Sequence, residues 1–94
     1  MSYSLKFKEE ALKEWRQLDS SLRILFKKKL AERVQNPRIP AARLSGQKDR
    51  YKIKLRNAGY RLVYEVRDTE IVVVVVAIGK RERNAVYKAA AKRL

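Results

Sequence analysis

The sequence predicts a small α+β fold, in which two helices pack on one face of a four-stranded sheet. Three features of the 94-residue chain support this prediction. Helix-spaced apolar residues occupy the first third, alternating strand patterns follow, and one continuous apolar run lies near the end. The expected order is β-α-α-β-β-β-(α), with an antiparallel meander in the second half. Residues 1–94 are expected to form one domain, because this length supports one modest core.

The first third of the chain predicts one strand and two helices. Residues 3–7 alternate between apolar and polar side chains, as in a strand. Glu9 and Glu10 suit the start of a helix, where the macrodipole favours anions. A break at residues 19–21 separates it from a second helix that reaches about Val34. The expected buried positions are Ala11, Leu12, Trp15 and Leu18 in the first helix, and Leu22, Leu25, Phe26, Leu30 and Val34 in the second.

A long loop is predicted between the second helix and the next strand. The helix ends at Asn36-Pro37, because the residue before a proline disfavours helical geometry. The loop then runs to Lys48 through Pro40 and Gly46. Loops of this length in so small a domain are often functional.

The segment YKIKLRNAGYRLVY, residues 51–64, predicts a β-hairpin around an Asn-Ala-Gly turn. Strand alternation sends the apolar side chains of the first run to one face, and Lys52, Lys54 and Arg56 to the other. If the loop holds two or four residues, Arg61 joins these cations opposite Lys54. A three-residue loop would place Arg61 on the other face.

This cation cluster is electrostatically unfavourable unless something neutralises it. Two unit charges ~5 Å apart repel by roughly 3 kcal/mol at an effective dielectric of ~20. No Asp or Glu lies between Lys52 and Arg61. One interpretation is that the face binds a polyanion. The other is a solvated basic edge, on which lysines discourage aggregation.

A buried central strand is predicted at residues 71–78, and a short helix at residues 84–94. Five consecutive valines favour a strand that is covered on both faces and ends at Gly79. This eight-residue run is far shorter than the roughly 20 residues of a membrane-spanning helix, so no membrane partner is expected. The terminal helix contains few large apolar residues, which predicts weak anchoring.

Charge and composition narrow the possible functions. The chain has 24 Lys and Arg against 10 Asp and Glu, a net charge of +14, which favours nucleic acid or another acidic partner. It contains no cysteine and no histidine, so a disulfide framework, a thiolate metal site and imidazole catalysis are excluded. We expect no cofactor and no metal site. The absence of cysteine is compatible with a cytoplasmic location.

Lysine, arginine and tyrosine can support one reaction well, the internal transesterification of RNA. The substrate supplies its own nucleophile, the ribose 2′-hydroxyl, and fixed cations stabilise the dianionic transition state. A lysine crowded by other cations has a lowered pKa and becomes a better base. Further basic residues could form a solvated face or contact phosphates: Arg23, Lys27 and Lys28 in the second helix, Arg43 and Lys48 in the loop, and Arg56 and Arg83.

Four segments together resemble the RelE toxins of RelBE type II toxin–antitoxin systems, in the RelE/ParE superfamily. The resemblance covers essentially the whole chain and includes the missing histidine. It implies a RelE-like microbial ribonuclease fold. The segments are Ala11-Leu-Lys-Glu-Trp15, Asn36-Pro-Arg-Ile39, YKIKLRNAGYRLVYEV and GKRERNAVY, the last spanning Gly79–Tyr87.

The resemblance implies a ribosome-dependent mRNA endonuclease with five active-site residues. Lys54 would be the base, Lys52 its assistant, and Arg61 the clamp on the scissile phosphate. Arg81 would stabilise the leaving group, and Tyr87 would stack on a base or orient the hydroxyl. Each also has a structural reading: Lys52 and Lys54 could be edge solubilisers, Arg81 could be part of a charged helix start, and Tyr87 could lie in the core. Arg61 could pair with Glu65 or Glu82.

The implied partners are mRNA in the A site of the 70S ribosome, 16S rRNA and a RelB-like antitoxin. Cleavage would fall between the second and third codon positions and leave a 2′,3′-cyclic phosphate. The antitoxin would wrap the toxin, displace its C-terminal helix and bind operator DNA only together with it. The chain departs from the family at Ser45, where an arginine is expected before Gly46, which affects one ribosomal RNA contact. The alternative function is a non-catalytic RNA- or ribosome-binding module.

Overall fold

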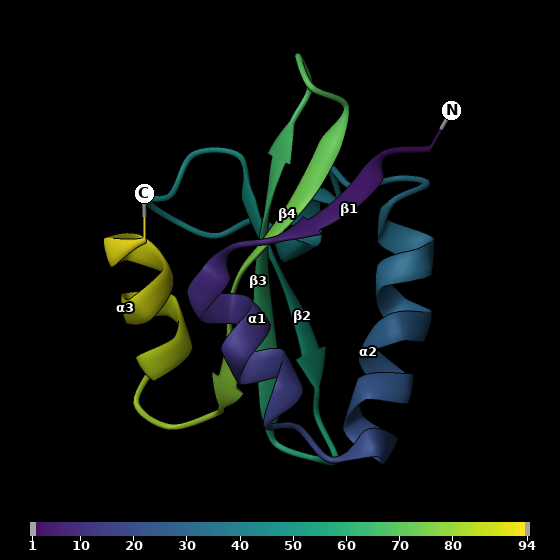
Figure 1. The fold of residues 1–94 in the computed structure, drawn as a ribbon. Helices are drawn as coiled ribbons and strands as arrows, with labels where there is room; N and C mark the ends of the chain where they lie inside the picture. The colour runs from purple at the N-terminus through teal and green to yellow at the C-terminus, as the bar shows by residue number, and fades with distance from the viewer. Residues whose placement is uncertain (1, 94) are drawn as a thin grey trace.

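The computed structural model describes residues 2–93, and its elements follow the predicted order (Figure 1). The sheet has the strand order β1-β4-β3-β2. Strands β2, β3 and β4 form the antiparallel meander, and β1 pairs in parallel with β4. The α+β prediction is confirmed. The bounds are β1 Ser4–Phe7, α1 Glu9–Arg16, α2 Ser20–Arg33, the 3-10 turn η1 Pro40–Ala42, β2 Arg50–Leu55, β3 Tyr60–Arg67, β4 Val72–Lys80 and α3 Ala85–Lys92.

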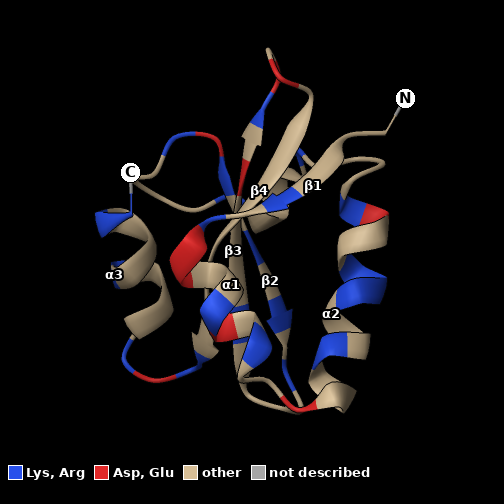
Figure 2. Cartoon of the chain, in the orientation of Figure 1, with Lys and Arg blue, Asp and Glu red and all other residues tan. Residues whose placement is uncertain are grey.

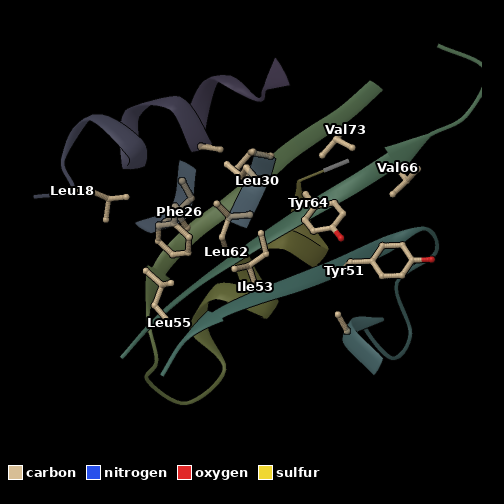
Figure 3. Packing of buried hydrophobic residues seen from close by; sticks show 14 residues of the cluster. Leu18, Phe26, Leu30, Tyr51, Ile53, Leu55, Leu62, Tyr64, Val66 and Val73 are labelled. Atoms are coloured by element: carbon tan, nitrogen blue, oxygen red, sulfur yellow. The ribbon is translucent and has the colours of Figure 1, made fainter. Parts of the chain in front are cut away.

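Helices α1 and α2 pack on one face of the sheet, as predicted. Phe26 and Leu30 of α2 are buried against Ile53 and Leu62 of the hairpin strands (Figure 3). Trp15 of α1 packs against the same cluster, 6.5 Å from Phe26 between ring centroids. This cluster therefore fixes which face of β2 and β3 is apolar.

Helix α3 covers the opposite face. Its buried residues, Val86 and Ala90, join Val63 and Val76 in a second, smaller cluster. Residues 72–78 of β4 are buried throughout, because helices cover the central strand on both sides. Among residues 2–93, no helix combines the length and the apolarity needed to cross a membrane.

Three details of the sequence analysis are wrong. Ile71, predicted as the start of the buried central strand, lies in the turn before β4 and has 41% of its surface exposed, because β4 begins at Val72. Leu25, expected in the buried stripe of α2, has 46% of its surface exposed. Helix α2 packs on β2 at the edge of the sheet, so its buried stripe is narrow and Leu25 lies outside it. Strand β4 also continues past Gly79 to Lys80, because Lys80 pairs with Tyr60 in the ladder.

Candidate active site

The hairpin register places three predicted site residues on the face that α3 covers. The loop between β2 and β3 spans residues 56–59, and Lys54 lies directly opposite Arg61, as the four-residue alternative predicts. Gly59 has a φ of +69°, a conformation that favours glycine, and its N–H donates to the Leu55 carbonyl at 2.9 Å. Since Ile53 and Leu62 point towards α1 and α2, the alternating Lys52, Lys54 and Arg61 point the other way.

A hollow of about 300 Å³, the cationic hollow, opens beside Lys54 and Arg61. Arg81 reaches it because its backbone N–H donates to the Gly59 carbonyl at 2.7 Å, which joins the end of β4 to the hairpin turn. Among residues 2–93, no carboxylate lines the hollow. Such a surface suits an anionic ligand with several acceptor oxygens. Its lining residues are Lys54, Leu55, Arg56, Gly59, Tyr60, Arg61 and Arg81.

Crowding by cations lowers the pKa of the Lys54 ammonium. The largest cause is the charge of Lys52, followed by partial burial, and then by Arg61, Arg56 and Arg81. Each neighbouring charge disfavours the protonated form. More of the Lys54 side chain is therefore a free amine at a given pH than in an isolated lysine.

Tyr87 of α3 contacts the guanidinium of Arg61. The Arg61 Nη1 donates to the Tyr87 hydroxyl at 3.1 Å, and the guanidinium carbon lies 5.2 Å from the centroid of the tyrosine ring. In the described chain, Arg61 forms neither of the ion pairs considered for it, with Glu65 or Glu82, and its buried Nε lacks a hydrogen-bond partner. The protein thus holds Arg61 in place without neutralising it.

The remaining RNA-binding candidates are distributed over four regions: the hollow, the loop at residues 43–48, the segment before α3, and helix α2. Arg56 lines the hollow itself. Arg43 and Lys48 line a separate hollow of about 560 Å³ in the loop at residues 43–48, which also contains the exposed Ser45. The exposed Arg83 precedes α3 and is not among the residues that line the cationic hollow.

The candidates Arg23, Lys27 and Lys28 belong to α2, a helix with several cations that packs on the other sheet face (Figure 2), and none of the three lines the cationic hollow. Arg23 has a structural role there, because its Nη1 donates to the Leu18 carbonyl at 2.6 Å. Lys27 and Lys28 are exposed. A contact between these three residues and RNA stays a prediction.

Sequence analysis did not single out Arg50, which continues the cationic row of Lys52 and Lys54 along β2. Arg50 is buried, and Glu65 lies directly opposite it in β3. Positions 50, 52 and 54 alternate in the same way along the strand, and this pattern could have placed Arg50 on the same face as the two lysines. The sequence alone did not indicate that the end of α3 would cover position 50.

The fold and the hollow together define a class, small basic α+β domains with a carboxylate-free cationic site for an anionic ligand. A family model described as ParE toxin of type II toxin-antitoxin system, parDE, matches residues 5–85. The chain belongs to this toxin family, the RelE/ParE family.

Curated and solved relatives agree with this assignment. The chain is 56% identical over 94 residues to the mRNA interferase toxin RelE of Escherichia coli (strain K12), covering 100% of this chain and 99% of the relative. It matches the structure of the free E. coli RelE R81A/R83A mutant with a TM-score of 0.92 and 54% identity, covering 100% and 99% of the two chains. The same mutant in complex with an antitoxin RelBc peptide matches with a TM-score of 0.84, 54% identity and the same coverage.

Proposed function

We propose that this chain is a ribosome-dependent mRNA endonuclease, the toxin of a type II toxin–antitoxin pair. The observation that carries the proposal is the convergence of Lys54, Arg61 and Arg81 on one hollow without a carboxylate. The 56% identity to an mRNA interferase toxin RelE supports it.

The proposed reaction is an internal transesterification of the RNA backbone. The ribose 2′-oxygen attacks the adjacent phosphorus, so the O2′–P bond forms and the P–O5′ bond breaks. The free-amine form of Lys54, favoured by the charge of Lys52, takes the proton of the 2′-hydroxyl. The products are a 2′,3′-cyclic phosphate and a 5′-hydroxyl. The departing oxygen obtains its proton from water.

The two arginines stabilise charge in this reaction. Their N–H groups donate to the phosphate oxygens, which carry the most charge in the transition state. Arg81 stabilises the departing O5′ without protonating it, because a guanidinium keeps its proton above a pH of about 12. Tyr87 orients Arg61 through the hydrogen bond and the ring contact.

The ribosome and an antitoxin are the proposed partners. The hollow contains no obvious base-reading group, so we infer that mRNA is positioned in the A site of the 70S ribosome, with 16S rRNA contacting the basic surface. Because a relative binds an antitoxin RelBc peptide, we expect a RelB-like antitoxin here, and operator DNA binding only by the complex.

The direct test mixes the purified protein with programmed ribosomes, and separately with free RNA, and maps the cleavage ends. We expect cleavage within A-site codons, cyclic-phosphate ends, and little cleavage of free RNA. The Lys54→Ala and Arg81→Ala variants should bind ribosomes while cleavage falls by a factor on the order of 100 or more.

The matched control is Lys88→Ala, which removes an exposed cation of α3 that does not line the hollow. It should cleave like the wild-type chain. Undiminished cleavage by both hollow variants would refute the assignment. Salt-sensitive ribosome binding without any cleavage would favour the non-catalytic binding module instead.

A further inference from the structure

Arg50 is a buried cation on the same sheet face as the hollow. Only 5% of its surface is exposed, and it is the only charged residue buried to this degree among residues 2–93. Its Nε donates to Glu65 Oε1 at 3.0 Å, across the β2–β3 ladder. A buried arginine requires such compensation, because leaving its charge unpaired is strongly unfavourable.

The rest of the Arg50 guanidinium binds the C-terminal end of α3. Its Nη1 donates to the Ala90 carbonyl, and its Nη2 donates to the Arg93 carbonyl at 2.6 Å. The last carbonyls of a helix lack partners within the helix and carry partial negative charge. A planar guanidinium can bind them and a carboxylate at once, which a lysine ammonium cannot do with the same fixed geometry.

A short chain of hydrogen bonds connects Arg50 with the active-site tyrosine. The Arg50 Nη1 also donates to Gln47 Oε1 at 3.2 Å, and Gln47 Nε2 donates to the backbone carbonyl of Tyr87 at 3.1 Å. The hydroxyl of the same tyrosine accepts from Arg61 at 3.1 Å. Tyr87 is therefore held at two points: Gln47, itself bound by Arg50, holds its backbone carbonyl, and Arg61 holds its hydroxyl.

Few other polar contacts hold α3 over the sheet, although Val86 packs closely on Gly79 of β4. The helix spans eight residues, and only Val86 and Ala90 are buried. Its N-cap residue, Asn84, makes no side-chain capping bond. Arg93 also connects the end of the helix to α1 and β4, through Glu14 at 2.7 Å and the Val76 carbonyl at 3.0 Å, but neither contact involves Tyr87.

We propose that Arg50 and Gln47 are positioning residues, which hold α3 so that Tyr87 keeps Arg61 aimed at the scissile phosphate. The proposal deepens the proposed function and rests on it, because it assigns these residues to the same cleavage reaction. Neither residue touches the hollow, so their effect must pass through Tyr87.

The test is a double-mutant cycle on single-turnover cleavage of programmed ribosomes. Arg50→Ala should lower the rate at saturating protein on the order of tenfold, because small misplacements of a catalytic group slow the reaction strongly. The half-saturating concentration should stay within about twofold, since ground-state binding is unchanged. Gln47→Ala, a milder variant, should lower the rate less. In a Tyr87→Ala background, both substitutions should have no further effect.

A variant on the other sheet face controls for general loss of stability. Phe26→Leu leaves a cavity beneath α2, and Phe26 neither lines the hollow nor belongs to the cluster that packs α3, so the saturating rate of the folded protein should be unchanged. Hydrogen exchange should show faster exchange in α3, but not in β4, for Gln47→Ala and Arg50→Ala.

Additive rate losses in the Tyr87→Ala background would overturn the positioning role, as would unchanged rates in both single variants. If Arg50→Ala does not fold, the Gln47→Ala cycle decides alone. A wild-type chain that does not cleave would overturn the proposed function together with this role. An active wild-type chain with unaffected variants would overturn the positioning role alone.

Discussion

The cations on the α3 side of the sheet differ in whether nearby groups compensate their charge. Arg50 is buried and compensated by Glu65 and by helix carbonyls. Lys54 and Arg61 lie at the opposite end of the same strands, where no carboxylate lines their hollow. The uncompensated pair keeps its charge available for a ligand, and that crowding also lowers the pKa of Lys54.

The pH dependence of cleavage tests the role of Lys54 as the base. A base must be unprotonated, so the rate should rise with pH and level off above the lowered pKa of Lys54. Lys52→Met removes the largest cause of that lowering, so the pKa rises and the inflection should move to higher pH. Single-turnover rates across pH measure the shift.

The control for this prediction is Lys6→Met, which removes an exposed lysine of β1. Its profile should overlay that of the wild-type chain. An inflection that stays in place, or moves to lower pH, in Lys52→Met would show that another group titrates.

Ile71 provides a second prediction at the level of one residue. It has a φ of +54°, a left-handed conformation that is a genuine outlier for a β-branched side chain. Ile71→Gly should therefore be more stable than Ile71→Ala by about 1 kcal/mol, because only glycine adopts this backbone without strain. Urea unfolding of the two variants measures the difference.

The same pair of substitutions inside a helix should give the opposite order. At Lys28 in α2, glycine should be less stable than alanine by about 1 kcal/mol. An alanine variant at position 71 that equals or exceeds the glycine variant would contradict the strain assigned to Ile71.

At the level of elements, side-chain periodicity accounts for most of what the sequence predicts. Alternation in the hairpin identifies the cationic face, and the four-residue turn puts Arg61 opposite Lys54, one of two registers left open. Parity depends only on the local backbone, so it can be read without tertiary contacts. The continuous valine run likewise predicts a strand that is covered on both faces, and helices provide this cover in the structure.

Features that depend on where elements meet were not predictable in the same way. Leu25 has helical spacing with buried residues, yet α2 lies at the sheet edge and leaves it exposed. Arg50 has the same strand parity as two site lysines, but its burial depends on the end of α3. Both outcomes follow from packing geometry that a one-dimensional pattern does not contain.

The close approach of α3 to β4 yields a prediction for this pair of elements. A Cβ added at Gly79 would lie 3.1 Å from Val86 Cγ2, so alanine there presses against the helix. Gly79→Ala and Val86→Ala should therefore couple favourably: the double variant should be more stable than the sum of the single effects by about 1 kcal/mol. Denaturant unfolding of the four proteins measures this.

Val63→Ala is the control partner for Gly79→Ala. It removes apolar volume from the same cluster, but Val63 is not the residue that a Cβ at position 79 would contact. That cycle should show a smaller coupling. Additive effects in the Gly79–Val86 cycle would contradict the prediction, because they would mean that α3 moves away from β4 at little cost in free energy.

Acidic residues are few in this chain, and one group of them lies around the turn between β3 and β4 (Figure 2). Four of the chain's ten acidic residues gather there, away from the cationic hollow. There Arg38 bridges Asp49 and Asp68 at 2.9 and 2.7 Å. Since the chain has a net charge of +14 and this acidic group does not line the hollow, it leaves the cations of the hollow uncompensated. The four acidic residues are Asp49, Glu65, Asp68 and Glu70.

Stability should consequently fall in acid. Burial raises the pKa of Glu65, but hydrogen bonds from Arg67 and Arg50 outweigh it, and the net pKa is lowered. Hydrogen bonds from Tyr3 and Arg38 lower the pKa of Asp68. The two carboxylates therefore bind protons more readily in the unfolded chain than in the folded one. Their contribution to the free energy of unfolding is complete above the ordinary pKa values of 4.5 for Glu65 and 3.8 for Asp68, and it is lost as the pH falls through the lowered pKa values of the folded protein.

Urea midpoints between pH 7 and pH 3 measure this loss. Below about pH 5, the urea midpoint should fall less steeply with decreasing pH in Glu65→Gln than in the wild-type chain. Glu32→Gln, at an exposed position near the end of α2, should leave this slope unchanged. An equally steep fall in Glu65→Gln and the wild-type chain would contradict the assignment.

The central claim is that fixed cations cleave RNA with the substrate's own 2′-hydroxyl as nucleophile. The most direct measurement programs ribosomes with an mRNA that carries a 2′-deoxy nucleotide on the 5′ side of the scissile phosphate. The account predicts that cleavage at this phosphate disappears, while the unmodified mRNA is cut and leaves a 2′,3′-cyclic phosphate. Cleavage of the 2′-deoxy mRNA at the same phosphate would contradict it.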